Sequence, residues 1–79
     1  MNKEDIKKLI GRALEVDAKK INDNSSSANI DNWDSLGHLS ILVALDKKFN
    51  GKISSISSFS TADSIEKIVI ELKKNKLID

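Results

Sequence analysis

Cysteine is absent from the 79-residue chain. Disulfide bonds and thiolate metal sites are therefore excluded, no metal site is expected, and any thiol chemistry requires a sulfur brought by a cofactor. Long apolar runs are also missing. None approaches the roughly 20 residues that span a bilayer, and the lysine-rich start lacks the continuous apolar segment of a secretory signal. We therefore expect a cytoplasmic protein that does not insert into a membrane.

A strong net charge is missing as well. Thirteen basic and twelve acidic side chains leave a formal charge of +1, too little for the global field of a nucleic-acid binder or a polybasic membrane protein. The charges are unevenly placed, because residues 21–46 contain four aspartates and no lysine or arginine. The middle of the chain is therefore locally acidic, whereas both ends are mixed.

The composition that remains is globular, with 39% apolar and 32% charged residues. A chain of this length is expected to form a single domain, residues 1–79. Only about 60% of its unfolded surface can be buried. We expect a monomer with a lean core and no room for a second domain that bears a site.

The N-terminal part predicts a helix and then a long loop. Asn2 can cap the helix, and Asp5 completes a capping box. Apolar residues recur at helical spacing on one face: Ile6, Leu9, Ile10, Ala13 and Leu14. Gly11 is expected to permit a close helix crossing. Residues 16–32 lose this periodicity and predict a surface loop, tethered by its apolar residues: Val16, Ile21, Ile30 and Trp33.

The longest predicted helix follows this loop and runs to Phe49. Asp34 is the expected N-cap, which places Ser35 at the first helical position with its hydroxyl toward solvent. A phosphodiester attached there would lie where the free N–H groups and the helix dipole favour an anion. The apolar residues of this helix cover more than one stripe, which predicts burial on several sides: Leu36, Leu39, Ile41, Leu42, Val43, Ala44, Leu45 and Phe49.

The C-terminal part predicts a minor helical element and a last main helix. Asn50-Gly51 offers a left-handed helix stop. Residues 52–60 predict a short helix or 3₁₀ turn, with two short strands as the alternative. Ser60 with Asp63 predicts a capping box for the last helix, which should fray at 73–76. The expected fold class is all-α: a small antiparallel four-helix bundle of three main helices and one short helix, with a long loop between helices 1 and 2.

The triplet Asp34-Ser35-Leu36, followed by an apolar helix that ends in Leu45-Asp46-Lys47-Lys48-Phe49, resembles the acyl carrier protein family and its peptidyl carrier relatives. The resemblance covers nearly the whole chain. In that family the serine after the aspartate carries a 4′-phosphopantetheine arm, taken from coenzyme A, whose thiol holds acyl groups as thioesters, and Ser35 matches it. The variant from Trp33 to Leu39 looks most like stand-alone carriers of specialised or surface-glycan pathways in bacteria.

Further site residues surround Ser35. The resemblance implies that Leu36, Leu39 and Val43 flank an acyl-chain cavity and touch partner enzymes, although core packing explains their spacing equally well. Trp33 is expected to anchor the loop, with a recognition surface as the alternative. His38 is expected to be a surface residue of the first helical turn, able to contact the phosphate or a partner enzyme.

The sequence also departs from the family. Many acyl carriers have acidic side chains along this helix, whereas the matching exposed positions here hold Gly37, Ser40, Lys47 and Lys48. Partner docking is therefore expected to be less electrostatic, and an assignment to fatty-acid synthesis does not follow.

We interpret the chain as a non-catalytic acyl carrier, modified by a phosphopantetheinyl transferase, loaded by an acyl or aminoacyl ligase and unloaded by downstream transferases. An aminoacyl or peptidyl carrier, a helical interaction or nucleic-acid-binding module, and an enzyme using Ser35 as nucleophile are the alternatives. The last needs a base and an oxyanion site, and His38 is the one base candidate. Cargo, chain length and pathway stay open.

Overall fold

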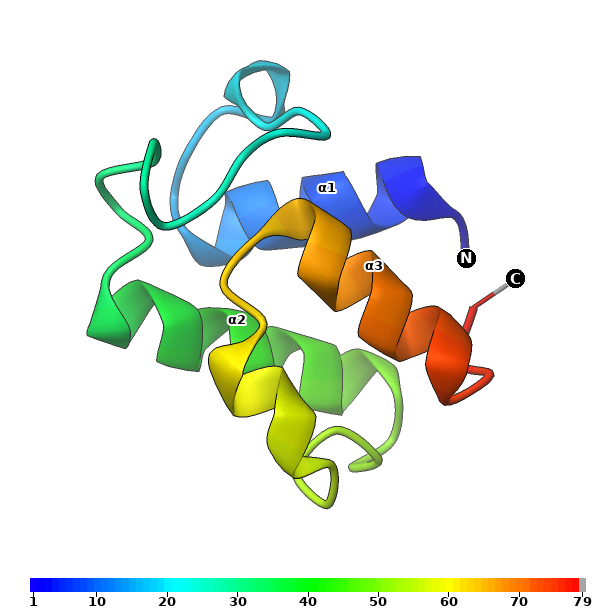
Figure 1. The fold of residues 1–79 in the computed structure, drawn as a ribbon. Helices are drawn as coiled ribbons and strands as arrows, with labels where there is room; N and C mark the ends of the chain where they lie inside the picture. Colours follow the sequence, from blue (N-terminus) through cyan, green and yellow to red (C-terminus); the bar gives the residue numbers. More distant parts are fainter. Residues whose placement is uncertain (79) are drawn as a thin grey trace.

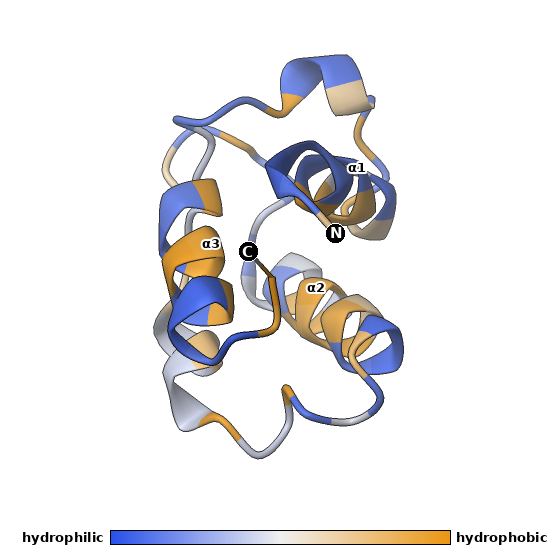
Figure 2. Cartoon of the chain, turned by 90° about the vertical axis from the view of Figure 1, so that its right-hand side faces the viewer, coloured by the Kyte–Doolittle hydropathy of each residue, from blue (hydrophilic) through white to orange (hydrophobic). Residues whose placement is uncertain are grey.

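The computed structural model describes residues 1–78. Its main elements are three α-helices, α1 (Lys3–Ala13), α2 (Ser35–Lys48) and α3 (Ile65–Lys74), with two 3₁₀ helices, η1 (Ala18–Lys20) and η2 (Ser57–Thr61). Helices α1 and α2 run antiparallel, and α3 crosses them obliquely (Figures 1 and 2). The all-α class is confirmed. A regular four-helix bundle is not, because the fourth element is a five-residue 3₁₀ helix and α3 is not aligned with the other two.

The N-terminal caps of α1 and α2 are those that the sequence predicts. Asn2 Oδ1 accepts a hydrogen bond from Asp5 N at 2.9 Å, and the Asp5 carboxylate accepts one from Asn2 N at 3.1 Å. Asp34 caps α2, so Ser35 is the first helical residue. These bonds satisfy amide groups that have no partner inside the helix.

The predicted start of the last helix is wrong. Ser60 lies in η2, where its hydroxyl donates to the Ser57 carbonyl at 2.7 Å. The cap of α3 is Ser64, whose Oγ accepts from Lys67 N at 3.1 Å. Helix α3 therefore begins at Ile65, since η2 uses the earlier residues for a turn of its own.

Helices α1 and α2 are each followed by a residue with a left-handed backbone conformation. Asn50 and Gly51 have φ values of 57° and 82°, which confirms the predicted stop after α2. Glu15 has φ 58°, and Val16 N donates to Gly11 O at 2.8 Å, so α1 ends at Ala13. A Cβ on Gly11 would lie 3.0 Å from the Val16 carbonyl oxygen. Gly11 thus admits the chain that follows α1, and the predicted helix crossing is wrong.

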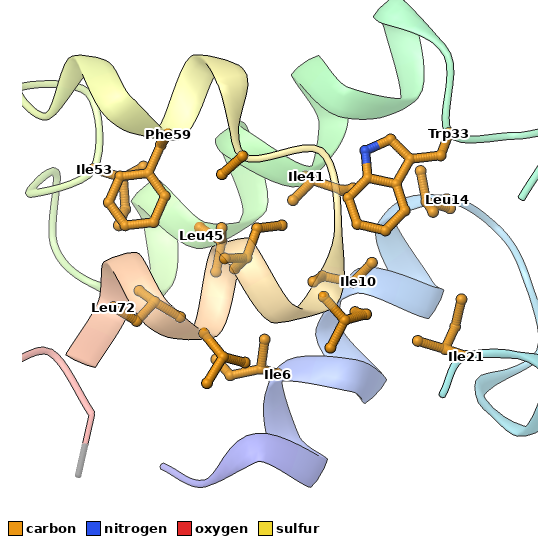
Figure 3. Packing of buried hydrophobic residues seen from close by; sticks show 14 of the residues in the cluster. Ile6, Ile10, Leu14, Ile21, Trp33, Ile41, Leu45, Ile53, Phe59 and Leu72 are labelled. Atoms are coloured by element: carbon orange, nitrogen blue, oxygen red, sulfur yellow. The ribbon is translucent and has the colours of Figure 1, made fainter. Parts of the chain in front are cut away.

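The core collects apolar side chains from all three helices, from the loop after α1 and from the segment around η2 (Figure 3). Its fully buried members include Ile6, Ile10, Ile41, Leu45, Ile53, Phe59, Ile65, Ile68 and Leu72. The expected tethers Ile21 and Trp33 are buried, and Val16 and Ile30 pack against the cluster. Burial of these side chains fixes the long loop on the helices.

Helix α2 does not have the multi-sided burial that its sequence predicts. Ile41 and Leu45 are fully buried, but Leu36, Leu39 and Val43 are 77%, 56% and 48% exposed. The reason is the small number of elements: α2 packs against α1 and η2, and nothing in the described part of the chain covers its remaining flank.

Backbone bonds join the loop after α1 to the start of α3. Ile65 N donates to the carbonyl of the buried Ser25 at 3.0 Å, and Ser27 N donates to the Asp63 carbonyl at 3.0 Å. These two bonds flank an isolated β-bridge between Ser26 and Ser64. No helix within residues 1–78 has the length and apolar character needed to cross a membrane.

Candidate functional site

Ser35 occupies an exposed position at the start of α2. Asp34 has an extended backbone, and its Oδ1 accepts from Gly37 N at 2.8 Å. The Asp34 carbonyl meanwhile accepts from His38 N at 2.8 Å. These two bonds cap α2 on either side of Ser35, and the exposed serine side chain takes no part in them.

The backbone before Ser35 is packed closely against the first turn of α2. A Cβ on Gly37 would lie 2.0 Å from the Asn32 carbonyl oxygen and 2.9 Å from Leu14 Cδ2. Asn32 Nδ2 also donates to the Leu14 carbonyl at 3.0 Å, at the end of α1. Gly37 is required here because any side chain would push the segment before Ser35 away from the helix.

His38 is not the free surface residue that the sequence predicts. Its Nδ1 accepts from the Trp33 indole Nε1–H at 3.0 Å, and its Nε2 lies 2.9 Å from the Phe59 carbonyl oxygen. Trp33 is 2% exposed, and the planes of the two rings lie 16° apart with centroids separated by 6.3 Å. His38 therefore joins the start of α2 to the loop and to η2.

The partners of His38 fix its tautomer. Indole nitrogen can only donate and a carbonyl oxygen can only accept. The ring must then be neutral, with its proton on Nε2 pointing to Phe59 and its Nδ1 lone pair pointing to Trp33. Neither ring nitrogen is left to take a proton from Ser35.

An open hollow of about 590 Å³ lies beside Ser35. One side is formed by the start of α2 with Asp34 and His38, and the other by Ser60, Thr61 and Asp63 at the end of η2. Ser27 and Trp33 of the long loop complete its wall. Most residues that line the hollow are polar, and four of them carry hydroxyl groups, so the hollow can accept hydrogen bonds from a flexible chain attached at Ser35.

Asp63 remains charged at the rim of this hollow. The Lys67 ammonium, 3.1 Å from Asp63 Oδ1, lowers the pKa of that carboxyl below its ordinary value. Asp34 adds a second carboxylate. Two acidic groups therefore lie near Ser35, one from the locally acidic middle of the chain and one from the segment before α3.

The predicted site residues separate into two groups. Trp33, Asp34, Ser35 and His38 meet around the polar hollow. Leu36, Leu39 and Val43 form the exposed apolar flank of α2, and the last two line a shallow hollow of about 370 Å³ with Ala13 and Ala44.

The sequence does not predict the side of the polar hollow that faces away from α2, which is formed by Ser27, Ser60, Thr61 and Asp63. These residues come from two distant segments, and the local pattern of Ser60 and Asp63 predicts a helix cap instead. No local pattern joins them to Ser35, because backbone bonds between the loop and the start of α3 bring them there.

Comparison with known proteins identifies a relative. No family model matches the chain. It is 41% identical over 51 residues to a protein named acyl carrier protein from Chlamydia caviae, a match that spans 65% of this chain and 66% of that protein's length. That protein bears the family name indicated by the residues around Ser35, and the all-helical fold agrees with it. The chain belongs to the acyl carrier protein family.

Proposed function

We propose that this protein carries acyl intermediates as thioesters on a 4′-phosphopantetheine arm attached to the Ser35 oxygen. The observation that carries the proposal is the placement of Ser35. It is exposed, it is the first residue of α2, and it follows the Asp34 cap in a chain related to an acyl carrier protein. The family relationship supports a carrier role in general, and the attachment site is our assignment.

The residues around Ser35 fit such an arm. A phosphodiester on the Ser35 oxygen would lie at the positive end of α2, where first-turn N–H groups favour an anion. Ser27, Ser60 and Thr61 line the adjoining hollow. Their hydroxyl groups donate to Asp63, Ser57 and Ser58, so their oxygens are left to accept hydrogen bonds from the amide N–H groups of the arm. When bound, the arm supplies the thiol that this cysteine-free chain lacks.

A carrier role is favoured over an enzyme that uses Ser35 as its own nucleophile. A nucleophilic serine needs a neighbouring base to take its proton. His38 is the sole histidine of the chain, and both of its ring nitrogens are engaged by Trp33 and Phe59. The protein is then a substrate of a phosphopantetheinyl transferase and of acyl-loading enzymes, and does no bond chemistry itself.

The flank of α2 next to Ser35 is the proposed contact surface for these enzymes. Leu36, Leu39 and Val43 are half to three-quarters exposed, which favours partner contact over the core packing that their spacing equally allowed. Trp33 is buried and bonded to His38, which favours its role as an anchor of the loop. His38 acts on the site by holding this anchor.

We infer an acyl cargo from the name of the relative, with an aminoacyl or peptidyl load as the alternative. A specialised bacterial pathway fits the sequence from Trp33 to Leu39 better than fatty-acid synthesis. The proposed partners are the transferase, a loading ligase and downstream acyltransferases, met by a cytoplasmic, monomeric, single-domain carrier.

The test is the intact mass of the protein after incubation with coenzyme A and a broad-specificity phosphopantetheinyl transferase. The parent should gain one phosphopantetheine, and Ser35→Ala should gain none. Ser40→Ala is the matched control, since Ser40 is also exposed on α2, and it should be modified like the parent. Modification that persists in Ser35→Ala, or a folded parent left unmodified by a transferase that modifies a control carrier, would contradict the proposal.

A further inference from the structure

A second surface lies between α1 and α2, at the end of α2 far from Ser35. It is a groove of about 840 Å³. Its floor is formed by the half-buried Leu9, Ala13 and Ala44, and Met1 is also part of its lining. Because α1 and α2 are antiparallel, the start of α1 meets the last turn of α2 here (Figure 1).

The rim of this groove is cationic. Lys8 and Arg12 line it from α1, and Lys47 and Lys48 line it from α2. None of these four exposed side chains forms an ion pair with another residue in the range 1–78. The single acid in the lining, Asp5, is engaged in the capping box with Asn2.

Lysines elsewhere on α1 behave differently. Lys3 and Lys7 both pair with Asp23 of the long loop, and Lys7 also pairs with Glu4. Their charge is therefore neutralised within the protein. Arg12, Lys47 and Lys48 lie in the last turns of their helices. Stabilisation of helix C-termini by positive charge therefore accounts in part for their presence. It does not explain Lys8 in the middle of α1, nor the apolar floor between the four cations.

The groove is continuous with the flank of α2 that leads to Ser35. The groove and the shallow hollow beside Leu39 and Val43 share Ala13, Ala44 and Lys47. At about 1.5 Å per residue, Lys47 lies about 18 Å along α2 from Ser35. One surface therefore runs from the serine, over exposed leucines, to a cationic groove.

We propose that this groove binds an acidic ridge with apolar side chains on the enzymes that act on the Ser35 arm. The assignment to those enzymes rests on the proposed carrier function. Many acyl carriers have acidic side chains along the helix after the serine, whereas this surface is cationic. Docking at the groove should therefore depend on charge, which revises the expectation of less electrostatic docking drawn from the sequence of α2. Complementary charge speeds encounter and selects partners, so this carrier should reject enzymes with basic docking patches.

The shape of the surface favours a protein ridge over an anionic membrane. A bilayer presents a flat surface, whereas this site is hollowed between two helices with its apolar residues on the floor. A row of side chains on a helix can enter such a groove and place carboxylates against the rim.

The test is an amide chemical-shift titration of the ¹⁵N-labelled protein with two designed helical peptides. Both carry the same stripe of leucines, flanked by glutamates in one and by lysines in the other. The glutamate peptide should shift amides of α1 and of the last turns of α2, and bind at least about tenfold more tightly than the lysine peptide. Its binding should weaken strongly near 1 M salt, where the screening length is about 3 Å.

Charge reversal provides the matched variants. Lys47→Glu with Lys48→Glu should lower the affinity for the glutamate peptide about tenfold. Lys19→Glu with Lys20→Glu changes the net charge equally on the exposed η1 and should have no such effect. Val43→Ser should weaken binding without altering the charge. All three sites are exposed, and circular dichroism checks that each variant is folded.

Several results would overturn the proposal. One is equal affinity for the two peptides, and another is amide shifts confined to other surfaces. The proposal also fails if the Lys19/Lys20 variant loses as much affinity for the glutamate peptide as the Lys47/Lys48 variant, or if the protein binds phosphatidylglycerol vesicles more tightly than the peptide. The titration is also run on Ser35→Ala, which should bind the glutamate peptide like the parent. If the parent binds the peptide but accepts no phosphopantetheine, the groove is upheld and its link to a carrier is removed. If the parent accepts phosphopantetheine but does not bind the peptide, the groove alone is refuted.

Discussion

His38 should stabilise the protein far more than a surface residue of a first helical turn would. His38→Ala removes the acceptor of the Trp33 indole N–H and the donor to the Phe59 carbonyl. Each such bond contributes about 1 kcal/mol. The better helix propensity of alanine returns about 0.5 kcal/mol. The expected net loss in unfolding free energy is about 1.5 kcal/mol.

Urea unfolding followed by far-ultraviolet circular dichroism measures this loss. For a domain of this size the melting temperature should fall by roughly 6–12 °C. Trp33 is the sole tryptophan, so its fluorescence should also change in the folded variant as the indole loses its partner. Ser40→Ala, on the exposed side of the same helix, should stay within about 0.5 kcal/mol of the parent.

A double-mutant cycle separates the bond from the rest of the cluster. Trp33→Phe removes the indole N–H and keeps an aromatic ring, so the two changes should be less than additive by about 1 kcal/mol. A loss below about 0.5 kcal/mol for His38→Ala, or strict additivity in the cycle, would refute the network and return His38 to the surface role predicted from the sequence.

Two further predictions concern the segments that hold the site. Gly37→Ala places a methyl group 2.0 Å from the Asn32 carbonyl oxygen, and it should destabilise by about 1–3 kcal/mol despite better helix propensity; a parent-like urea midpoint would contradict this. Bonds from Lys7 and Lys3 lower the pKa of Asp23, so this carboxylate stabilises the fold above its ordinary pKa, and the stabilisation is lost as pH falls through the lowered value. Asp23→Asn should therefore be less stable than the parent at about pH 7, and the difference should vanish near pH 2; a difference that persists in acid would have another cause.

The local features of the site follow from the sequence because their partners lie within a few residues. The caps at Asn2 and Asp34 each bond an amide three residues on, and a side chain with this reach forms the bond in any helix that starts there. The left-handed stop at Asn50-Gly51 is local for the same reason. The position of Ser35 at the head of a long helix was therefore predictable.

Choices between equivalent local patterns depended on the tertiary structure. Ser60 and Ser64 both suit a helix cap, and η2 and the bridge from Ser26 decided for Ser64. The same is true of burial on α2. Its apolar residues surround the helix, and only the placement of α1 and η2 determines that Ile41 is buried while Leu36 faces solvent.

The sequence by itself determined an all-helical chain, the start of each of the first two helices, and the place of Ser35 at the head of the second. The tertiary structure alone decided what surrounds that serine: a histidine held by Trp33 and Phe59, a polar hollow, and an apolar flank leading to a cationic groove. The physical reason is range. Caps and turns are closed by neighbours in the chain, whereas hollows and ring networks arise where segments distant in sequence are brought together by burial of a common core.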